Sequence, residues 1–255
     1  MINLLNGDCI EEMAKMDANS IDLTVTSPPY DNLRTYEGSL QWNEDIWKQV
    51  LEGLYRVTKE GGVVVWVVGD ATVKGSETGT SFKQALYAME CGFNLHDTMI
   101  YEKGNKPPLN HPRYEQAFEY MFILSKGKPS SVSLLTQPCI NAGKINTGTV
   151  RNSGSDDLAQ KHGAGKPYKE RKPLANIWRY NVGNVCKSAK VNHPAKFPEQ
   201  LAHDHIISWS NEGDTVFDPF MGSGTTGLAA KQLNRNFIGI EKVEKYYEIC
   251  KARVS

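Results

Sequence analysis

The sequence lacks the features that mark membrane and secreted proteins. No apolar run reaches the roughly 18 residues that a membrane-spanning helix requires, and the first residues contain neither a basic segment nor a long apolar one. We therefore expect no membrane contact and no signal peptide. Net charge is also absent, because 29 basic and 29 acidic side chains cancel. Zero charge argues at first against a nucleic-acid partner, since such domains usually carry a basic excess.

Cysteine is scarce and scattered. No Cys-x-x-Cys pair occurs, and the histidines have no metal-like spacing with acidic or cysteine partners, so we expect neither a zinc site nor another bound metal. An odd number of isolated cysteines also argues against a disulfide framework, which makes the reducing cytoplasm the expected location. The five cysteines are Cys9, Cys91, Cys139, Cys186 and Cys250.

The sequence does contain an alternation of strand-like and helix-like segments. Residues 43–57 have apolar positions at helical spacing, and residues 63–68 form a continuous apolar run, as expected of a strand covered on both faces. This alternation predicts an α/β protein with a largely parallel sheet. Further strands are expected at residues 21–26, 95–101, 118–124, 215–217 and 237–240, and further helices at 80–91, 199–209, 225–233 and 242–253.

The region from residue 126 to residue 196 has a different composition. Gly, Ser, Asn and Lys dominate it, and its apolar runs are short. It contains 13 Lys and Arg residues against three acidic ones, a net charge of +10, so the rest of the chain carries −10. The neutral total therefore hides a basic region in an acidic protein. Basic residues gathered in one region are what contact with phosphates requires, and they predict salt-sensitive binding.

The stretch Asp218–Gly227 indicates a ligand site. It lies between an expected strand and an expected helix, where glycines let the backbone approach a ligand and the helix N-terminus offers free N–H groups. Gly222, Gly224 and Gly227 have the spacing of a dinucleotide-binding loop. Glu241 follows 19 positions after the first glycine, where a carboxylate can accept hydrogen bonds from both ribose hydroxyls. The pattern predicts a nucleoside-type ligand.

An NAD-dependent dehydrogenase is an alternative that has the same glycine spacing. Two observations count against it. The loop comes late in the chain, with room for one more βα unit after it, whereas a dehydrogenase usually has this unit early. In addition, Asp218 precedes the glycines and provides a carboxylate at the end of the strand, where an amine-bearing ligand can be held.

A second candidate site is the corner Thr26–Tyr30, with the sequence Thr-Ser-Pro-Pro-Tyr, at the end of another expected strand. Ligands of open α/β sheets bind at the carboxyl ends of the strands. Ser27 Oγ and the Pro28 carbonyl can both accept hydrogen bonds from one amino group, and Tyr30 offers a flat face for stacking. Together these groups suit a planar base that carries an NH2 group.

With these two motifs the chain resembles the amino-group DNA methyltransferases that use S-adenosylmethionine. The catalytic motif comes first and the cofactor motif last, which is similar to the permuted β class, and the resemblance covers nearly the whole chain. The catalytic residues that it implies are Ser27, Pro28, Pro29 and Tyr30. The cofactor-binding residues that it implies are Asp8, Cys9, Lys196, Asp218, Phe220, Gly222, Ser223, Gly224, Thr225, Thr226 and Glu241.

The resemblance also implies a Rossmann-like methyltransferase sheet, mostly parallel, with a circularly permuted order of motifs. Residues 1–125 and 191–255 would together form the catalytic domain, and residues 126–190 an inserted target-recognition region. The expected partner is double-stranded DNA. Homodimers are common in the resembling class, and no segment of the sequence decides the assembly. The expected DNA-binding residues are Arg34, Arg151, Lys169, Arg171, Lys172 and Arg179.

The implied reaction is site-specific methyl transfer to the exocyclic amine of a base that has flipped out of the helical stack, as in restriction–modification enzymes. Within the resembling family, Ser at position 27 is typical of N4-cytosine enzymes and Asp of N6-adenine enzymes. We therefore favour N4 of cytosine, and N6 of adenine stays open as the alternative. Pro138-Cys139 matches the dipeptide of C5-cytosine methyltransferases, but it lies in the variable region without a strand–turn context, so we assign Cys139 no catalytic role.

Overall fold

The computed structural model describes residues 1–29, 42–105, 113–151, 158–160, 163–181 and 198–255. The chain divides into two compact units. Unit 1 consists of Met1–Ser133 and Asn176–Ser255, and unit 2 of Leu134–Ala175. Among the helices of the described ranges, we find none with the length and apolar character of a membrane span.

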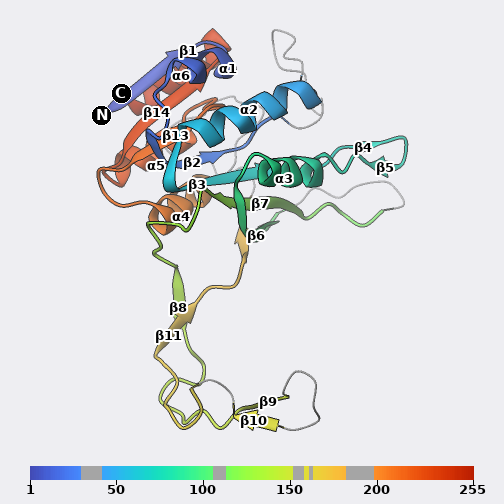
Figure 1. Ribbon diagram of the computed structural model, residues 1–255, viewed down its shortest axis with the longest axis vertical. Coiled ribbons are helices and arrows are strands. Elements are labelled where there is room, and N and C mark those ends of the chain that lie inside the picture. Colours follow the sequence, from blue (N-terminus) through green and yellow to red (C-terminus); the bar gives the residue numbers. More distant parts are fainter. Residues whose placement is uncertain (30–41, 106–112, 152–157, 161–162, 182–197) are drawn as a thin grey trace. The chain divides into compact units, whose positions relative to one another are not determined.

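Unit 1 is built on an eight-stranded sheet with the strand order β1-β14-β13-β2-β3-β7-β6-β12 (Figure 1). The five strands from β1 to β3 in this order run parallel to their neighbours, β7 is antiparallel to both β3 and β6, and β12 is parallel to β6. The strands are β1 Ile2–Asn6, β2 Ile21–Thr26, β3 Thr58–Val68, β6 Asn94–Lys103, β7 Phe118–Ser125, β12 Ile177–Tyr180, β13 Thr215–Asp218 and β14 Asn236–Glu241. The predicted α/β class with a mostly parallel sheet is confirmed.

The two ends of the sequence meet in the middle of this sheet. Val216 and Phe217 of β13 are in register with Leu23 and Thr24 of β2. On its other side β13 pairs with β14, and β14 in turn pairs with β1, the first strand of the chain. The late strands thus complete the sheet that the early strands begin, which is the arrangement expected from the permuted order of motifs.

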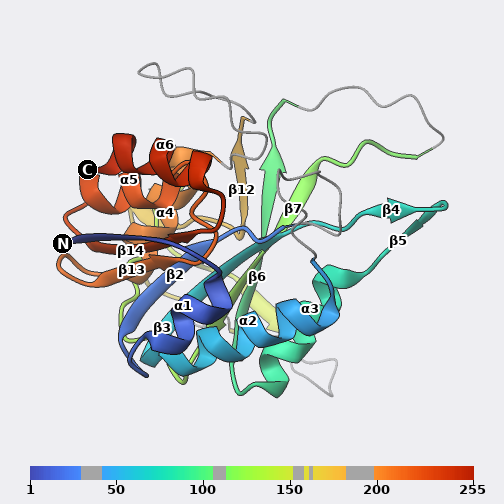
Figure 2. The same ribbon diagram turned by 90° about the horizontal axis from the view of Figure 1, so that it is seen from above.

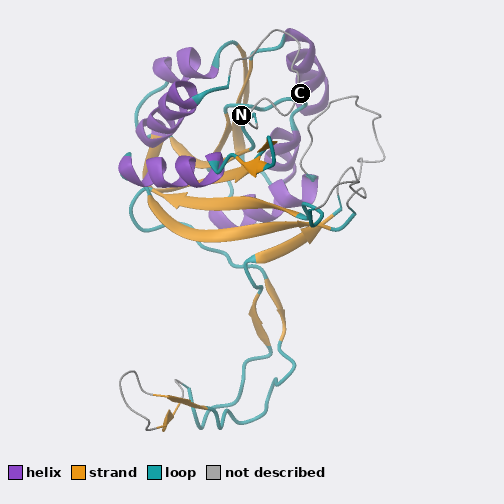
Figure 3. Ribbon diagram, turned by 90° about the vertical axis from the view of Figure 1, so that its right-hand side faces the viewer, coloured by secondary structure: helices purple, strands orange, loops and turns teal. Residues whose placement is uncertain are grey.

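Helices cover both faces of the sheet. Figure 2 shows α1, α2 and α3 on one face and α4, α5 and α6 on the other, and Figure 3 shows the helices in purple against the orange strands. The helices are α1 Cys9–Lys15, α2 Glu44–Val57, α3 Thr80–Glu90, α4 Glu199–Trp209, α5 Thr225–Gln232 and α6 Glu244–Val254. A short hairpin, β4 Thr72–Val73 with β5 Ser76–Glu77, precedes α3.

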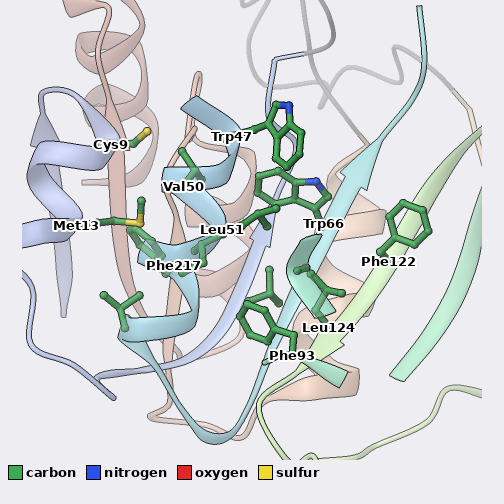
Figure 4. Packing of buried hydrophobic residues seen from close by; sticks show 14 of the residues in the cluster. Cys9, Met13, Trp47, Val50, Leu51, Trp66, Phe93, Phe122, Leu124 and Phe217 are labelled. Carbon is green, nitrogen blue, oxygen red and sulfur yellow. The ribbon is translucent and has the colours of Figure 1, made fainter. Parts of the chain in front are cut away.

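The core of unit 1 lies between the sheet and its helices. Trp47, Val50 and Leu51 extend from α2 toward Trp66 of β3 (Figure 4), and all four side chains are at most 3% exposed. The spacing of three and four residues from Trp47 to Val50 and Leu51 puts these three side chains on one face of α2. The indole N–H of Trp66 donates to Gln84 Oε1 at 2.9 Å, so this buried donor is paired.

Five elements of unit 1 were not among the expected ones, and two of them are the strands of the β4–β5 hairpin. Ile2–Asn6 forms β1, Cys9–Lys15 forms α1, and Ile177–Tyr180 forms β12. The last of these lies inside the predicted insertion of residues 126–190, yet it extends the main sheet by pairing with β6. Unit 2 is therefore narrower than the predicted insertion at both of its ends.

Unit 2 contains two short antiparallel pairs of strands. β8 Thr136–Pro138 pairs with β11 Arg171–Pro173, and β9 Thr149–Arg151 pairs with β10 Leu158–Gln160. Among its described side chains, Asn146 alone is buried, and its Oδ1 accepts hydrogen bonds from the Gly148 amide at 3.0 Å and the Tyr168 hydroxyl at 2.9 Å. Within the described part of this unit, polar contacts and strand pairing take the place of buried apolar side chains.

Candidate active site

The two candidate sites of the sequence lie at the same edge of the sheet. β2 ends at Thr26 and continues into Ser27 and the two prolines, and β13 ends at Asp218 and continues into the glycine loop, residues 219–224. Because β2 and β13 are parallel neighbours, their carboxyl ends lie together. Ser27 and Pro29 are half-buried and Pro28 is buried. Tyr30 lies outside the described residues.

Two buried hydroxyl groups connect the candidate sites directly. Thr26 Oγ1 donates to Asp218 Oδ1 at 2.7 Å, and Thr226 Oγ1 donates to the Val25 carbonyl oxygen at 3.1 Å. Both threonines are fully buried, and Asp218 is 2% exposed. Each hydrogen bond joins a residue of the late motif to the strand that carries Ser27, across about two hundred positions of sequence. The separation between the Ser27 corner and the glycine loop is therefore fixed by side chains of both motifs.

The Asp218 carboxylate is an acceptor enclosed by protein. Its Oδ1 also accepts the Phe220 amide hydrogen at 3.0 Å, which shapes the first turn of the glycine loop. Burial raises the pKa of Asp218 to about 6, although the hydrogen bonds that it accepts act in the opposite direction. Asp218 thus organises the loop in addition to its predicted contact with the cofactor.

The glycine loop depends on backbone conformations that other residues avoid. Gly222 has φ of 50° and Gly224 has φ of 82°, both in the left-handed region. A Cβ atom at Gly227 would lie 2.6 Å from the Phe237 ring, so the first turn of α5 packs directly against β14. The side chains of Ser223, Thr225 and Thr226 are buried beside these glycines, and the ring of Phe220 meets that of Trp42 edge to face at 5.5 Å.

Glu241 faces the glycine loop from the end of β14. Its Oε2 accepts the Gly222 amide hydrogen at 3.0 Å, and its Oε1 accepts the Val243 amide hydrogen at 2.8 Å. Burial raises the pKa of Glu241, while these backbone donors partly offset the rise. Each carboxylate oxygen can accept a second hydrogen bond, so the predicted contact with ribose hydroxyls is compatible with this geometry.

Asp8 and Cys9 lie on the neighbouring β1–α1 turn. Asp8 Oδ1 caps α1 by accepting the Ile10 amide hydrogen at 2.9 Å, and Oδ2 is 3.1 Å from Lys242 Nζ. Burial alone would raise the pKa of Asp8, but Lys242 and the cap amides lower it overall. Cys9 belongs to the buried core cluster, and burial raises the pKa of its thiol to about 12. Cys9 is therefore a neutral thiol packed in the core, and its contact with the cofactor stays a prediction.

The predicted DNA-binding residues fall in different parts of the chain. Lys169, Arg171 and Lys172 are exposed in unit 2, and Arg171 also donates to Thr136. Arg179 is exposed on β12 of unit 1, 3.9 Å from Glu102. Arg151 ends β9, whereas Arg34 and the predicted cofactor residue Lys196 lie outside the described residues.

One contact of the glycine loop has no counterpart in the sequence reasoning. Arg253, near the end of α6, donates from Nη1 to the Ser223 carbonyl and hydroxyl, and from Nη2 to Glu199 at 2.8 Å. A basic residue in the last turn of a helix usually faces solvent, so no sequence signal distinguished it.

A family model described as DNA methylase (N6_N4_Mtase) matches residues 21–252, which is most of the chain. The chain belongs to this DNA methylase family. It is 52% identical over 241 residues to the orphan methyltransferase M.BamHII of Bacillus amyloliquefaciens, with 92% of this chain and 89% of that protein covered. It is 25% identical over 249 residues to the DNA adenine methyltransferase YhdJ of Escherichia coli (strain K12), with 96% and 80% covered.

Solved structures of DNA methyltransferases share the fold. The cytosine-N4-specific PvuII DNA methyltransferase matches with a TM-score of 0.75 at 22% identity, covering all of this DNA methylase and 86% of that chain. TTHA0409 of Thermus thermophilus, in complex with S-adenosyl-L-methionine, matches with a TM-score of 0.66 at 25% identity, covering 100% and 95%. The predicted Rossmann-like methyltransferase fold and the predicted family are confirmed, and the dehydrogenase alternative is wrong.

Proposed function

We propose that this DNA methylase transfers a methyl group from S-adenosylmethionine to the exocyclic N4 amine of cytosine in double-stranded DNA. The family supplies the broader assignment, a DNA methyltransferase of the N4/N6 amino type. The choice of cytosine depends on one observation, which is Ser27 at the end of β2. Enzymes of the family that act on adenine typically carry Asp at this position.

The residues around the glycine loop fit S-adenosylmethionine. The left-handed glycines at 222 and 224 let the backbone approach the ligand, and Glu241 offers carboxylate oxygens beside the loop for the ribose. The start of α5 has no side-chain cap in the structure, so its amides can bind the methionine carboxylate. When bound, S-adenosylmethionine supplies a methyl group activated by its sulfonium.

Ser27 and Pro28 prepare the amine to receive that methyl group. The exocyclic nitrogen is a poor nucleophile because its lone pair is delocalised into the ring. Ser27 Oγ and the Pro28 carbonyl can accept hydrogen bonds from its two N–H groups, which localises the lone pair and directs it toward the donor. On methylation the amine must also release one proton, which water can take. Proline has no N–H to compete for neighbouring carbonyls. The gain comes from orientation and electrostatics, because the protein forms no covalent bond to the base.

The cysteines support a mechanism without a covalent intermediate. Burial raises the pKa of Cys9 and of Cys250 to about 12, so both stay as thiols at neutral pH. Pro138 ends β8 and a turn follows Cys139, so the expectation that the Pro-Cys dipeptide lacks a strand–turn context is wrong. The dipeptide lies on a two-stranded antiparallel pair of unit 2 and not on the main sheet that carries the corner. The target base must leave the stack to reach the corner, which costs about a few kcal/mol. Stacking on Tyr30 would offset part of this cost.

We infer that target recognition belongs to the basic region of residues 126–190. Unit 2, its centre, contains seven Lys and Arg residues against three acidic ones in the sequence. Lys169, Arg171 and Lys172 are exposed there and available to phosphates. A homodimer and a cytoplasmic location stay predictions of the sequence.

Methylation of N6 of adenine is the second candidate, and the similarity to the E. coli adenine enzyme favours it. The two reactions use the same acceptor pair, so they differ in the base that the pocket admits. The test is nucleoside mass spectrometry of DNA treated with the enzyme and S-adenosylmethionine. We expect N4-methylcytosine. N6-methyladenine without N4-methylcytosine would overturn the choice of cytosine, and DNA treated with the Ser27→Ala variant is the matched control.

A further inference from the structure

Arg253 connects three segments of unit 1 that are far apart in the sequence. They are the glycine loop at Ser223, the first residue of α4 at Glu199, and the last turn of α6. We propose that Arg253 is a positioning residue that holds the glycine loop in its cofactor-binding conformation.

The contact uses the fork shape of the guanidinium group. Nη1 donates to the Ser223 carbonyl and, at 3.1 Å, to the Ser223 hydroxyl, while Nη2 donates to Glu199 Oε1 at 2.8 Å. The Arg253 side chain is 15% exposed and that of Glu199 32%, so water screens the ion pair less than it would an exposed one. Lysine cannot serve two directions with the same geometry, which makes the position specific for Arg.

The loop needs such a contact because its own backbone is permissive. Ser223 stands between two glycines in the left-handed region, Gly222 and Gly224, and glycine restricts the backbone less than any other residue. On one side the Gly222 amide donates to Glu241 of β14. On the other side Arg253 of α6 binds the Ser223 carbonyl. Together with the hydrogen bonds of the Phe220 amide to Asp218 and of the Met221 amide to the Ile240 carbonyl, these two contacts fix the path of the loop over the end of β13.

The second partner of Arg253 is Glu199, the first residue of α4. An acidic side chain in the first turn of a helix is also stabilised by the helix dipole. Arg253 therefore ties the glycine loop to the start of α4.

If Arg253 only stabilised the fold, its loss would lower thermal stability at least as much as cofactor affinity. Tyr246, Cys250 and Val254 are buried along α6 and hold the helix against unit 1 without Arg253. Loss of the guanidinium should therefore leave α6 in place and release the loop. Cofactor affinity should fall much more than thermal stability.

The test compares Arg253→Gln with Lys251→Gln, a control at an exposed residue of the same helix whose partner is Glu248. The readouts are the Kd for S-adenosylmethionine by calorimetry, KM and kcat for methyl transfer, and Tm. We expect Arg253→Gln to raise Kd and KM about tenfold, as for the loss of a charged hydrogen bond, and to leave kcat at saturating cofactor within about twofold. Arg253→Lys should recover part of the affinity.

An Arg253→Gln enzyme with the Kd of the Lys251→Gln control would overturn the inference, whether or not its Tm falls. If Arg253→Gln does not fold, Glu199→Gln takes its place, because it removes only the partner's charge. We expect this variant to raise Kd about threefold, and an unchanged Kd again contradicts the proposal. The inference rests on S-adenosylmethionine as cofactor. Failure of the unmodified enzyme to bind it would contradict the proposed function instead, and the identity of the methylated base is independent of Arg253.

Discussion

The two units of this DNA methylase are stabilised in opposite ways. Unit 1 buries large apolar side chains on both faces of its sheet. Leu51 of α2 on one face and Leu201 of α4 on the other are both at 0% exposure. Unit 2 has no buried hydrophobic side chain among its described residues, and Ile140 is 91% exposed. Burial of apolar surface is the main driving force of folding, so stability resides in unit 1. The side chains of unit 2 are instead available for contact with something outside the chain.

The polar contacts of unit 2 agree with this comparison. Asn146 satisfies the Gly148 amide and the Tyr168 hydroxyl, and Arg171 fixes the β8–β11 pair by donating to Thr136. Such contacts define a local structure without burying apolar side chains. If DNA contact belongs to unit 2, as we propose, chemistry and stability can be changed separately from DNA affinity, and substitutions in the two units should have different effects.

The largest effect should come from the catalytic corner of unit 1. We expect Ser27→Ala to reduce methyl transfer by about 10²-fold or more, because it removes one of two acceptors for the target amine. The Kd for S-adenosylmethionine should stay unchanged. Incorporation of labelled methyl groups into DNA measures the first quantity and calorimetry the second.

Cys139→Ala in unit 2 is the control for this experiment and should retain activity. Loss of activity in Cys139→Ala together with retention in Ser27→Ala would reverse the assignment of the chemistry to unit 1. Tyr30→Ala should behave like Ser27→Ala, because stacking of the flipped base is needed for the same step.

The next effect concerns stability. Leu51 is fully buried between α2 and the sheet, so Leu51→Ala should lower the free energy of unfolding by about 2–5 kcal/mol. Ile140→Ala, the matched substitution in unit 2, should change it by less than about 0.5 kcal/mol. Urea denaturation followed by circular dichroism measures both. Similar losses for the two variants would contradict the comparison of the units.

The smallest effect should be on DNA affinity. Replacing both Lys169 and Lys172 by Gln should weaken DNA binding at low salt. The slope of log K against log salt concentration should become shallower by about 0.9 for each phosphate that the protein no longer neutralises. Fluorescence anisotropy at several salt concentrations measures this. Lys15→Gln, at an exposed lysine of unit 1, is the control. An unchanged slope in the double variant would show that unit 2 does not contact phosphates through these residues.

Much of unit 1 could be predicted because its elements have strong periodic patterns. The apolar spacing of residues 43–57 anticipated α2 with an offset of one residue, and the glycine loop anticipated the turn from β13 into α5. The sequence patterns did not predict β1 and β12, because both segments are short and become strands only by pairing with β14 and β6. Such pairing depends on the assembled sheet.

The number of basic residues in residues 126–196 says less about DNA contact than the position of each one in the structure. Lys126 contributes to the +10 of residues 126–196, yet its ammonium group donates to Asn19 Oδ1 and to the Tyr55 and Thr58 carbonyls within unit 1. It therefore serves the fold. The contact of Thr26 with Asp218 and that of Arg253 with Ser223 were also beyond sequence reasoning, because neither pair has a spacing rule.

The pairing of β2 with β13 has a consequence for synthesis of the protein. The corner at Ser27 is made early and the Asp218 loop late, and the bonds of Thr26 and Thr226 form only when both are present. A growing chain whose β13 has not yet left the ribosome cannot have the complete site that we propose for methyl transfer. Competence should therefore appear as a single late event, when the last βα units close the sheet, and a partly made chain should leave DNA unmodified.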